Sequence, residues 1–212
     1  MEYNSLLNLV GDDPVFESAM LLSGEIDPKN IRLQLSRWVN SGRVYQLRRG
    51  LYAIAPPYQK TIPHPFLVAN HLQRSSYVSL QSVLAFYGMI PDTVTVITSV
   101  GTGRPEKLAT PLGTFEYRHV KSTLFFGYQV IDVGGQEIFV ATPGKALLDL
   151  VYLTPDGDSP GFLQGLRLQN LDRINLGQLQ KDSMTFDTPK MDRAAKVISQ
   201  MAFSETTEYE DL

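Results

Sequence analysis

Cysteine is absent from this 212-residue chain, which excludes disulfides, thiolate metal sites and cysteine nucleophiles. Lysine and arginine are absent before Lys29, so the basic start of a secretory signal peptide is missing. No uninterrupted apolar run approaches the roughly 18 residues that a membrane span needs. We therefore expect a cytoplasmic protein that has no membrane partner.

Acidic residues are absent from one long stretch of the chain. Residues 28–91 carry eight Lys and Arg and no Asp or Glu, whereas residues 1–27 carry six acids and no Lys or Arg. The formal net charge of −3 at pH 7 conceals this segregation. Chance clustering on a solvated face is the simpler alternative, but it explains a window of this length poorly. Such asymmetry indicates a surface that faces a polyanion.

Motifs of catalysis and metal binding are also missing. The glycines of "GTGRPEK" (101–107) lack the spacing of a phosphate-binding loop, and no G-x-S-x-G elbow occurs. The acids of "DGD" (156–158) lie in a Pro-flanked turn, which favours a solvated loop. No zinc-binding pattern includes the three histidines, His64, His71 and His119. We expect no catalytic residue, no metal site, no cofactor and no enzyme activity.

The first 58 residues read as three short helices followed by a hairpin. Helical spacing predicts a helix over 3–10, and the start signals Asp12/Asp13-Pro14 and Asp27-Pro28 predict two more. The second would end at Ser23-Gly24 and the third at about Ser41-Gly42. Alternating apolar residues then predict a hairpin over 44–54. This order is typical of a winged helix-turn-helix.

The rest of the chain predicts an α+β protein. We expect a winged helix-turn-helix domain over 1–58, a mixed α/β C-terminal domain with antiparallel strands and a helical C-terminal region over 62–203, and a flexible acidic tail over 204–212. The C-terminal domain would contain helices over 66–74, 80–87 (capped by Ser79) and from Pro143 to about Thr154, and strands over 93–100, 113–120, 128–133 and 137–142.

The third helix has two chemically distinct faces. Ile31, Leu35, Trp38 and Val39 form one apolar stripe, so we interpret Trp38 as a core residue. The opposite face offers cations and short polar side chains, which suit the major groove of DNA. A solvated face would normally mix both signs of charge, and this one has no acid. Its polar residues are Lys29, Arg32, Ser36 and Asn40, with Arg37 at the margin.

The hairpin places Arg48 and Arg49 beside Gly50 at its tip. In a winged helix, such a tip reaches a neighbouring phosphate backbone or the minor groove. A surface hairpin with two solubilising arginines is the simpler alternative. The candidate DNA-binding residues are Lys29, Arg32, Ser36, Arg37, Asn40, Arg43, Arg48 and Arg49.

Three segments in the right order resemble the AbiEi family, the antitoxins of bacterial type IV toxin–antitoxin systems. They are "QLSRWVNSGRVYQLRRGLYAI" (34–54), "YVSLQSVLAFYGMIP" (77–91) and "VATPGKALLDLVYL" (140–153). The resemblance implies a repressor that binds double-stranded DNA at inverted repeats in its own promoter. It also implies a C-terminal domain that counters a nucleotidyltransferase-like toxin, directly or indirectly. Gly144 departs from the family, which often has Glu there.

Two other functions remain open from the sequence. The chain could be a protein-interaction module that neutralises a partner directly, with little DNA binding. It could also be a nucleic-acid-processing enzyme, in which case Asp156 and Asp158 would be needed for metal-dependent turnover.

Overall fold

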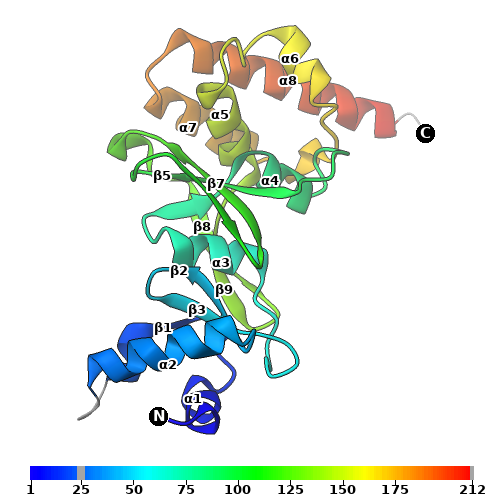
Figure 1. The fold of residues 1–212 in the computed structure, drawn as a ribbon. Helices are drawn as coiled ribbons and strands as arrows, with labels where there is room; N and C mark the ends of the chain where they lie inside the picture. The colour runs from blue at the N-terminus through cyan, green and yellow to red at the C-terminus, as the bar shows by residue number, and fades with distance from the viewer. Residues whose placement is uncertain (23–26, 211–212) are drawn as a thin grey trace.

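Two sheets and two hydrophobic cores organise the chain in this computed structural model, which describes residues 1–22 and 27–210 (Figure 1). Among the described residues, the buried members of the smaller core lie between positions 6 and 54. The larger core draws mainly on residues 66–202. Helices and mixed sheets together confirm the α+β class.

The first elements are α1 (Tyr3–Val10), β1 (Phe16–Glu17), the 3-10 helix η1 (Ser18–Leu22), α2 (Pro28–Asn40), β2 (Val44–Arg48) and β3 (Leu51–Ile54). The two helix limits predicted from caps are confirmed. Gly11 ends α1 with a φ of 60°, a conformation that glycine adopts readily. The Asp27 carboxylate begins α2 by accepting the backbone N–H of Lys29 at 2.9 Å.

The helix predicted from Asp12 or Asp13 through Leu22 is wrong. Phe16 and Glu17 instead form β1, which pairs with Tyr52 and Leu51 of β3. Within the predicted helix, only Ser18–Leu22 is helical, and it forms the short 3-10 helix η1. Tertiary pairing with β3 therefore overrides the local helix signal. The predicted end at Ser23-Gly24 lies outside the described residues.

β3 is the central strand of the small sheet, whose order is β1-β3-β2, and it is buried along its whole length. Tyr52 and Ile54 belong to the smaller core with Trp38, which is only 6% exposed. Leu51 and Ala53 belong to the larger core. The sheet thus lies between the N-terminal helices on one side and α3 (Pro65–Leu72) on the other (Figure 1).

Gln136 fixes the connection between the two sheets. Its side-chain oxygen accepts the backbone N–H of His64 at 2.8 Å, and its amide nitrogen donates to the oxygen of Ile62 at 3.0 Å. His64 in turn begins α3, because its Nδ1 accepts the backbone N–H of Phe66 at 3.1 Å. The segment after the hairpin is therefore held against residues 66–210, which we call the second part of the chain.

The larger sheet has the order β6-β7-β5-β4-β9-β8. The pairs β4–β5, β6–β7 and β8–β9 are antiparallel, as the sequence predicts, whereas β5–β7 and β4–β9 are parallel, which the sequence did not predict. β4 and β6 are short and were not predicted. The strands are β4 (Ser76–Val78), β5 (Val96–Gly101), β6 (Glu106–Thr110), β7 (Gly113–His119), β8 (Tyr128–Val133) and β9 (Gln136–Ala141).

The C-terminal helices gather at the end of the molecule opposite α2 (Figure 1). Residues 204–210, which belong to the tail predicted for 204–212, continue α8. The Glu205 carboxylate accepts the backbone N–H groups of Asn170 at 2.8 Å and Leu171 at 2.7 Å. Residues 211–212 lie outside the described part. The remaining elements are α4 (Leu80–Phe86), η2 (Ser122–Leu124), α5 (Pro143–Leu153), α6 (Pro160–Gly165), η3 (Leu171–Arg173), α7 (Leu176–Thr185) and α8 (Pro189–Glu210).

Candidate functional site

The outward face of α2 is a solvent-exposed cationic surface. Ile31, Leu35 and Trp38 are buried, as the apolar stripe predicted. Salt bridges elsewhere use seven cations, and none of them lies on α2 within residues 1–22 and 27–210. The helix thus presents charges that are available to an external anion. The residues of α2 that the sequence predicts to contact DNA are all exposed: Lys29, Arg32, Ser36, Arg37 and Asn40.

The tip of the β2–β3 hairpin lies against the second part of the chain. Arg48 donates from Nη1 to the backbone oxygen of Leu72 at 2.8 Å and lies 3.5 Å from the carboxylate of Glu106. This differs from the outward-pointing wing expected from the sequence, because the apolar face of the small sheet packs on α3. We therefore assign Arg48 to the contact between the two parts.

A cleft of about 410 Å³ opens beside the hairpin tip, between it and the end of α3. Arg49 and His71 line it, together with Arg74, whose guanidinium forms an ion pair with Glu17. Arg49 is exposed and, among the described residues, takes part in none of the ion pairs. Both tip arginines line the cleft, but only Arg48 has an ion-pair partner among the described residues.

Arg43 is held near the end of α2 by an aromatic ring. Its guanidinium carbon lies 5.2 Å from the ring centroid of Tyr3, a cation–π distance. The Tyr3 hydroxyl donates to the backbone oxygen of Arg43 at 3.1 Å. Burial raises the pKa of Tyr3 above its ordinary value. The contact ties α1 to the strand that follows α2.

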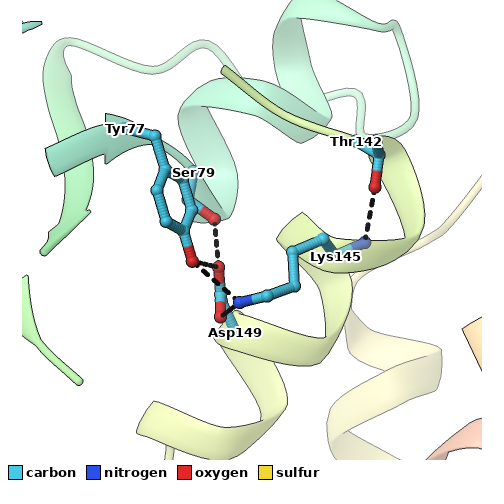
Figure 2. Close-up of polar contacts among 5 residues, drawn as sticks. All are labelled: Tyr77, Ser79, Thr142, Lys145 and Asp149. Carbon is cyan, nitrogen blue, oxygen red and sulfur yellow. Dashed lines mark hydrogen bonds and ion pairs between the residues drawn. The ribbon is translucent and has the colours of Figure 1, made fainter. Parts of the chain in front are cut away.

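A second group of functional side chains is buried between the large sheet and α5 (Figure 2). The Lys145 ammonium forms an ion pair with Asp149, one helical turn away, and donates to the Tyr77 hydroxyl at 2.7 Å. The Asp149 carboxylate accepts the hydroxyls of Tyr77 at 3.0 Å and Ser79 at 2.8 Å. All four residues are 0% exposed. The charges are therefore satisfied internally and closed to solvent.

Aromatic rings and the backbone at Gly127 lie close to Lys145. Its ammonium lies 4.8 Å from the ring centroid of Phe126 and 5.2 Å from that of Phe186. A Cβ at Gly127, where φ is +72°, would lie 2.9 Å from Cγ of Lys145. Burial lowers the pKa of Lys145 and raises that of Asp149. The network therefore reads as a structural centre that joins β4, α4 and α5.

Sequence reasoning missed this network. Ser79 was predicted to cap α4, but its side chain makes no cap hydrogen bond and donates to Asp149 instead. The available signal was the Lys145–Asp149 spacing of four in an otherwise apolar helix. Its partners lie about 70 positions away in the chain, so spacing alone could not identify them.

Gly144, the departure from the AbiEi pattern, lies in the first turn of α5 and is buried. A Cβ at this position would lie 3.3 Å from Leu179 and 3.4 Å from Ile174. The helix-start role predicted for this segment is confirmed, because the Thr142 hydroxyl accepts the backbone N–H of Lys145 at 3.4 Å (Figure 2). Glycine here allows α7 to pack closely on α5.

The other candidate groups have structural partners. His119 Nδ1 lies 3.0 Å from the oxygen of Gly103, and Asp158 forms an ion pair with Arg193 of α8 at 2.7 Å. Within the described residues, no cluster of three or more His, Asp or Glu side chains is arranged to hold a metal ion. No helix of residues 1–22 and 27–210 has the length and apolar content required to span a membrane.

Comparison of the chain with protein-family models and with curated proteins gives no match. The resemblance to AbiEi antitoxins therefore stays a prediction, which rests on the three sequence segments that suggested it.

Proposed function

We propose that residues 1–58 form a winged-helix unit that binds double-stranded DNA, with α2 in the major groove. The observation that carries this proposal is the exposed cationic face of α2, on which Lys29, Arg32 and Arg37 have no acidic partner among the described residues. Arg side chains can bind guanine edges, and Ser36 and Asn40 add further hydrogen-bonding groups. Phosphate contacts would supply most of the non-specific affinity.

The hairpin has a smaller role in this proposal than the sequence suggested. Arg49 is exposed at the tip and would contact a phosphate beside the groove that α2 occupies. Arg48 is not assigned to DNA, because its guanidinium contacts Leu72 and Glu106. Arg43 would contact DNA only with the ring of Tyr3 at its side. The wing thus contributes one free arginine rather than two.

We further propose that the chain represses its own promoter and acts as the antitoxin of a type IV toxin–antitoxin pair. The order of the three AbiEi-like segments supports this second step. Its test is co-expression with the product of the adjacent reading frame, which we expect to be a nucleotidyltransferase-like toxin. Growth should be restored by the wild-type chain. Continued growth arrest with well-expressed, folded protein would contradict the antitoxin role.

DNA binding is tested by a gel shift with the full chain and the duplex immediately upstream of its reading frame. The wild type should shift this duplex, whereas Arg32→Ala and Arg37→Ala should each weaken the shift. Lys181→Ala is the matched control, because Lys181 is an exposed cation on α7, at the far end of the molecule (Figure 1). Equal binding by all four proteins would contradict a DNA site on α2.

One observation favours the alternative, a module that binds a partner protein. Val130 and Phe139 face each other across the β8–β9 pair and are 51% and 43% exposed. β8 is also an edge strand of the larger sheet. An exposed apolar pair on an edge strand is a typical protein-binding feature. If Val130→Asp abolishes antitoxin action but leaves the gel shift unchanged, the partner is bound directly through this edge.

A further inference from the structure

Leu33 lies near the centre of the polar face of α2. Its side chain is 50% exposed, although it is a large apolar group. Residues three and four positions apart are neighbours on a helix surface, so Leu33 is flanked by Lys29, Ser36 and Arg37. All three of these neighbours are exposed. An apolar side chain is therefore surrounded by cationic and hydrogen-bonding groups.

The fold does not use this leucine for packing. Ile31, which is buried, lies about 160° away around the helix at 100° per residue. Among the described residues, Leu33 belongs neither to the smaller core nor to the partly buried side chains that pack against it. The apolar surface of Leu33 is thus left for an external contact.

We propose that Leu33 contacts the C5-methyl group of a thymine in the major groove, and so makes α2 specific for a T·A pair. This inference rests on the proposed DNA-binding function. The thymine methyl is the apolar group that base edges present in the major groove. The charges around Leu33 favour DNA over an apolar protein groove as its binding partner. In an apolar groove, Lys29 and Arg37 would lose their water without gaining an anionic partner.

The position in α2 fits this role. Leu33 is the sixth of the 13 residues of α2, within its N-terminal half. In helix-turn-helix proteins, the N-terminal residues of the recognition helix contact base edges. Lys29 and Arg37, one turn before and after Leu33, would then bind phosphates or guanine edges on either side of the thymine. Leu33 determines specificity, while the neighbouring cations supply affinity.

The test compares two versions of the upstream duplex, amplified with either thymidine or deoxyuridine triphosphate, which differ only in the C5-methyl group. Each is titrated with the full-length wild type, Leu33→Ala and Leu9→Ala. Leu9 is the matched control, because it is an exposed leucine on α1 with 46% of its surface accessible. Circular dichroism confirms that the variants are folded, which is expected for substitutions at exposed sites.

Wild type and Leu9→Ala should bind the uracil duplex more weakly than the thymine duplex, by about fourfold for each thymine methyl group that Leu33 contacts. This ratio corresponds to about 0.8 kcal/mol for one buried methyl-sized group. Leu33→Ala should bind both duplexes equally, at the affinity of the wild type for uracil DNA. Equal wild-type binding to both duplexes, or the same thymine preference in Leu33→Ala, would overturn the inference while the DNA-binding proposal stands. If the wild type binds neither duplex, the proposed function itself fails and the inference fails with it.

Discussion

Arg48 and Leu72 are joined by a hydrogen bond of 2.8 Å, from the guanidinium Nη1 to the backbone oxygen at the end of α3. This bond connects the tip of the β2–β3 hairpin to the second part of the chain. Glu106 of β6 adds a carboxylate 3.5 Å from the same nitrogen. The two arginines of the hairpin tip, adjacent in the sequence, therefore have different surroundings and should have different functions.

Arg48→Ala should lower stability, and Arg49→Ala should weaken DNA binding. Loss of the Arg48 hydrogen bond should reduce the free energy of unfolding by about 1 kcal/mol. Loss of one phosphate contact at Arg49 should reduce the slope of log affinity against log salt by about one. Urea denaturation and anisotropy titrations measure the two effects. If Arg48→Ala instead weakened DNA binding and left stability unchanged, the structural role of Arg48 would be contradicted. Such a result would show that the hairpin tip leaves α3 when DNA binds.

Lys145→Met should strongly destabilise the protein, because it leaves the Asp149 carboxylate buried without its cation. Breaking a buried ion pair from one side costs about 3–5 kcal/mol. The double variant Lys145→Met with Asp149→Leu removes both charges and should be much less destabilised than the sum of the single changes. Urea denaturation of the two single variants and the double variant tests this coupling. If the loss of unfolding free energy in the double variant equalled the sum of the losses in the two single variants, the two charges would not stabilise each other.

Unfolding of the full chain should be a single transition. Trp38, the only tryptophan, reports on the smaller core through its fluorescence, whereas far-ultraviolet circular dichroism reports on the whole chain. β3 places Tyr52 in one core and Leu51 in the other, so one part cannot unfold without exposing the apolar surface of its neighbour. The two signals should coincide along a urea titration. A fluorescence transition at a clearly lower urea concentration than the circular-dichroism transition would show that the two parts unfold as independent domains.

Asp158→Asn should remove a pH-dependent contribution to stability. The hydrogen bond from Arg193 holds the pKa of Asp158 below its ordinary value. A lowered folded-state pKa stabilises the protein above the ordinary carboxyl pKa of about 3.9, and this stabilisation is lost as the pH falls through the folded-state value.

The free energy of unfolding of the wild type should therefore exceed that of Asp158→Asn by about 0.2–1 kcal/mol near pH 7, the usual range for a partly exposed ion pair. This difference should disappear at acidic pH. The matched control is Asp156→Asn, because Asp156 is exposed and in none of the ion pairs found among the described residues. A gap that is equally large at low pH would mean that the ion pair is not its cause.

Local signals in the sequence predicted α1, α2, the hairpin, α5 and most strands, because caps, glycines and periodicity act within a few residues. The errors all involve distant partners. Phe16 forms a strand because it pairs with Tyr52, and α8 continues past residue 204, where Glu205 binds the backbone at Asn170. The parallel pairs of the larger sheet likewise depend on contacts that no local pattern encodes.

The candidate site divides in the same way. The cationic face of α2 could be predicted, because helical periodicity places Arg32 and Arg37 away from the apolar stripe. The docking of Arg48 could not, because it depends on how α3 packs against the small sheet. The buried network could not be predicted either, since Tyr77 and Asp149 come from separate elements.

The salt dependence of DNA binding tests the central claim most directly. Affinity of the full chain for its upstream duplex is measured over a series of salt concentrations, for the wild type and for the triple variant Lys29→Ala, Arg32→Ala, Arg37→Ala. The slope of log affinity against log salt is about −0.9 for each phosphate that the protein neutralises. If α2 binds DNA, the triple variant should bind more weakly and with a slope that is shallower by about two to three. An affinity and a slope equal to those of the wild type would contradict the account.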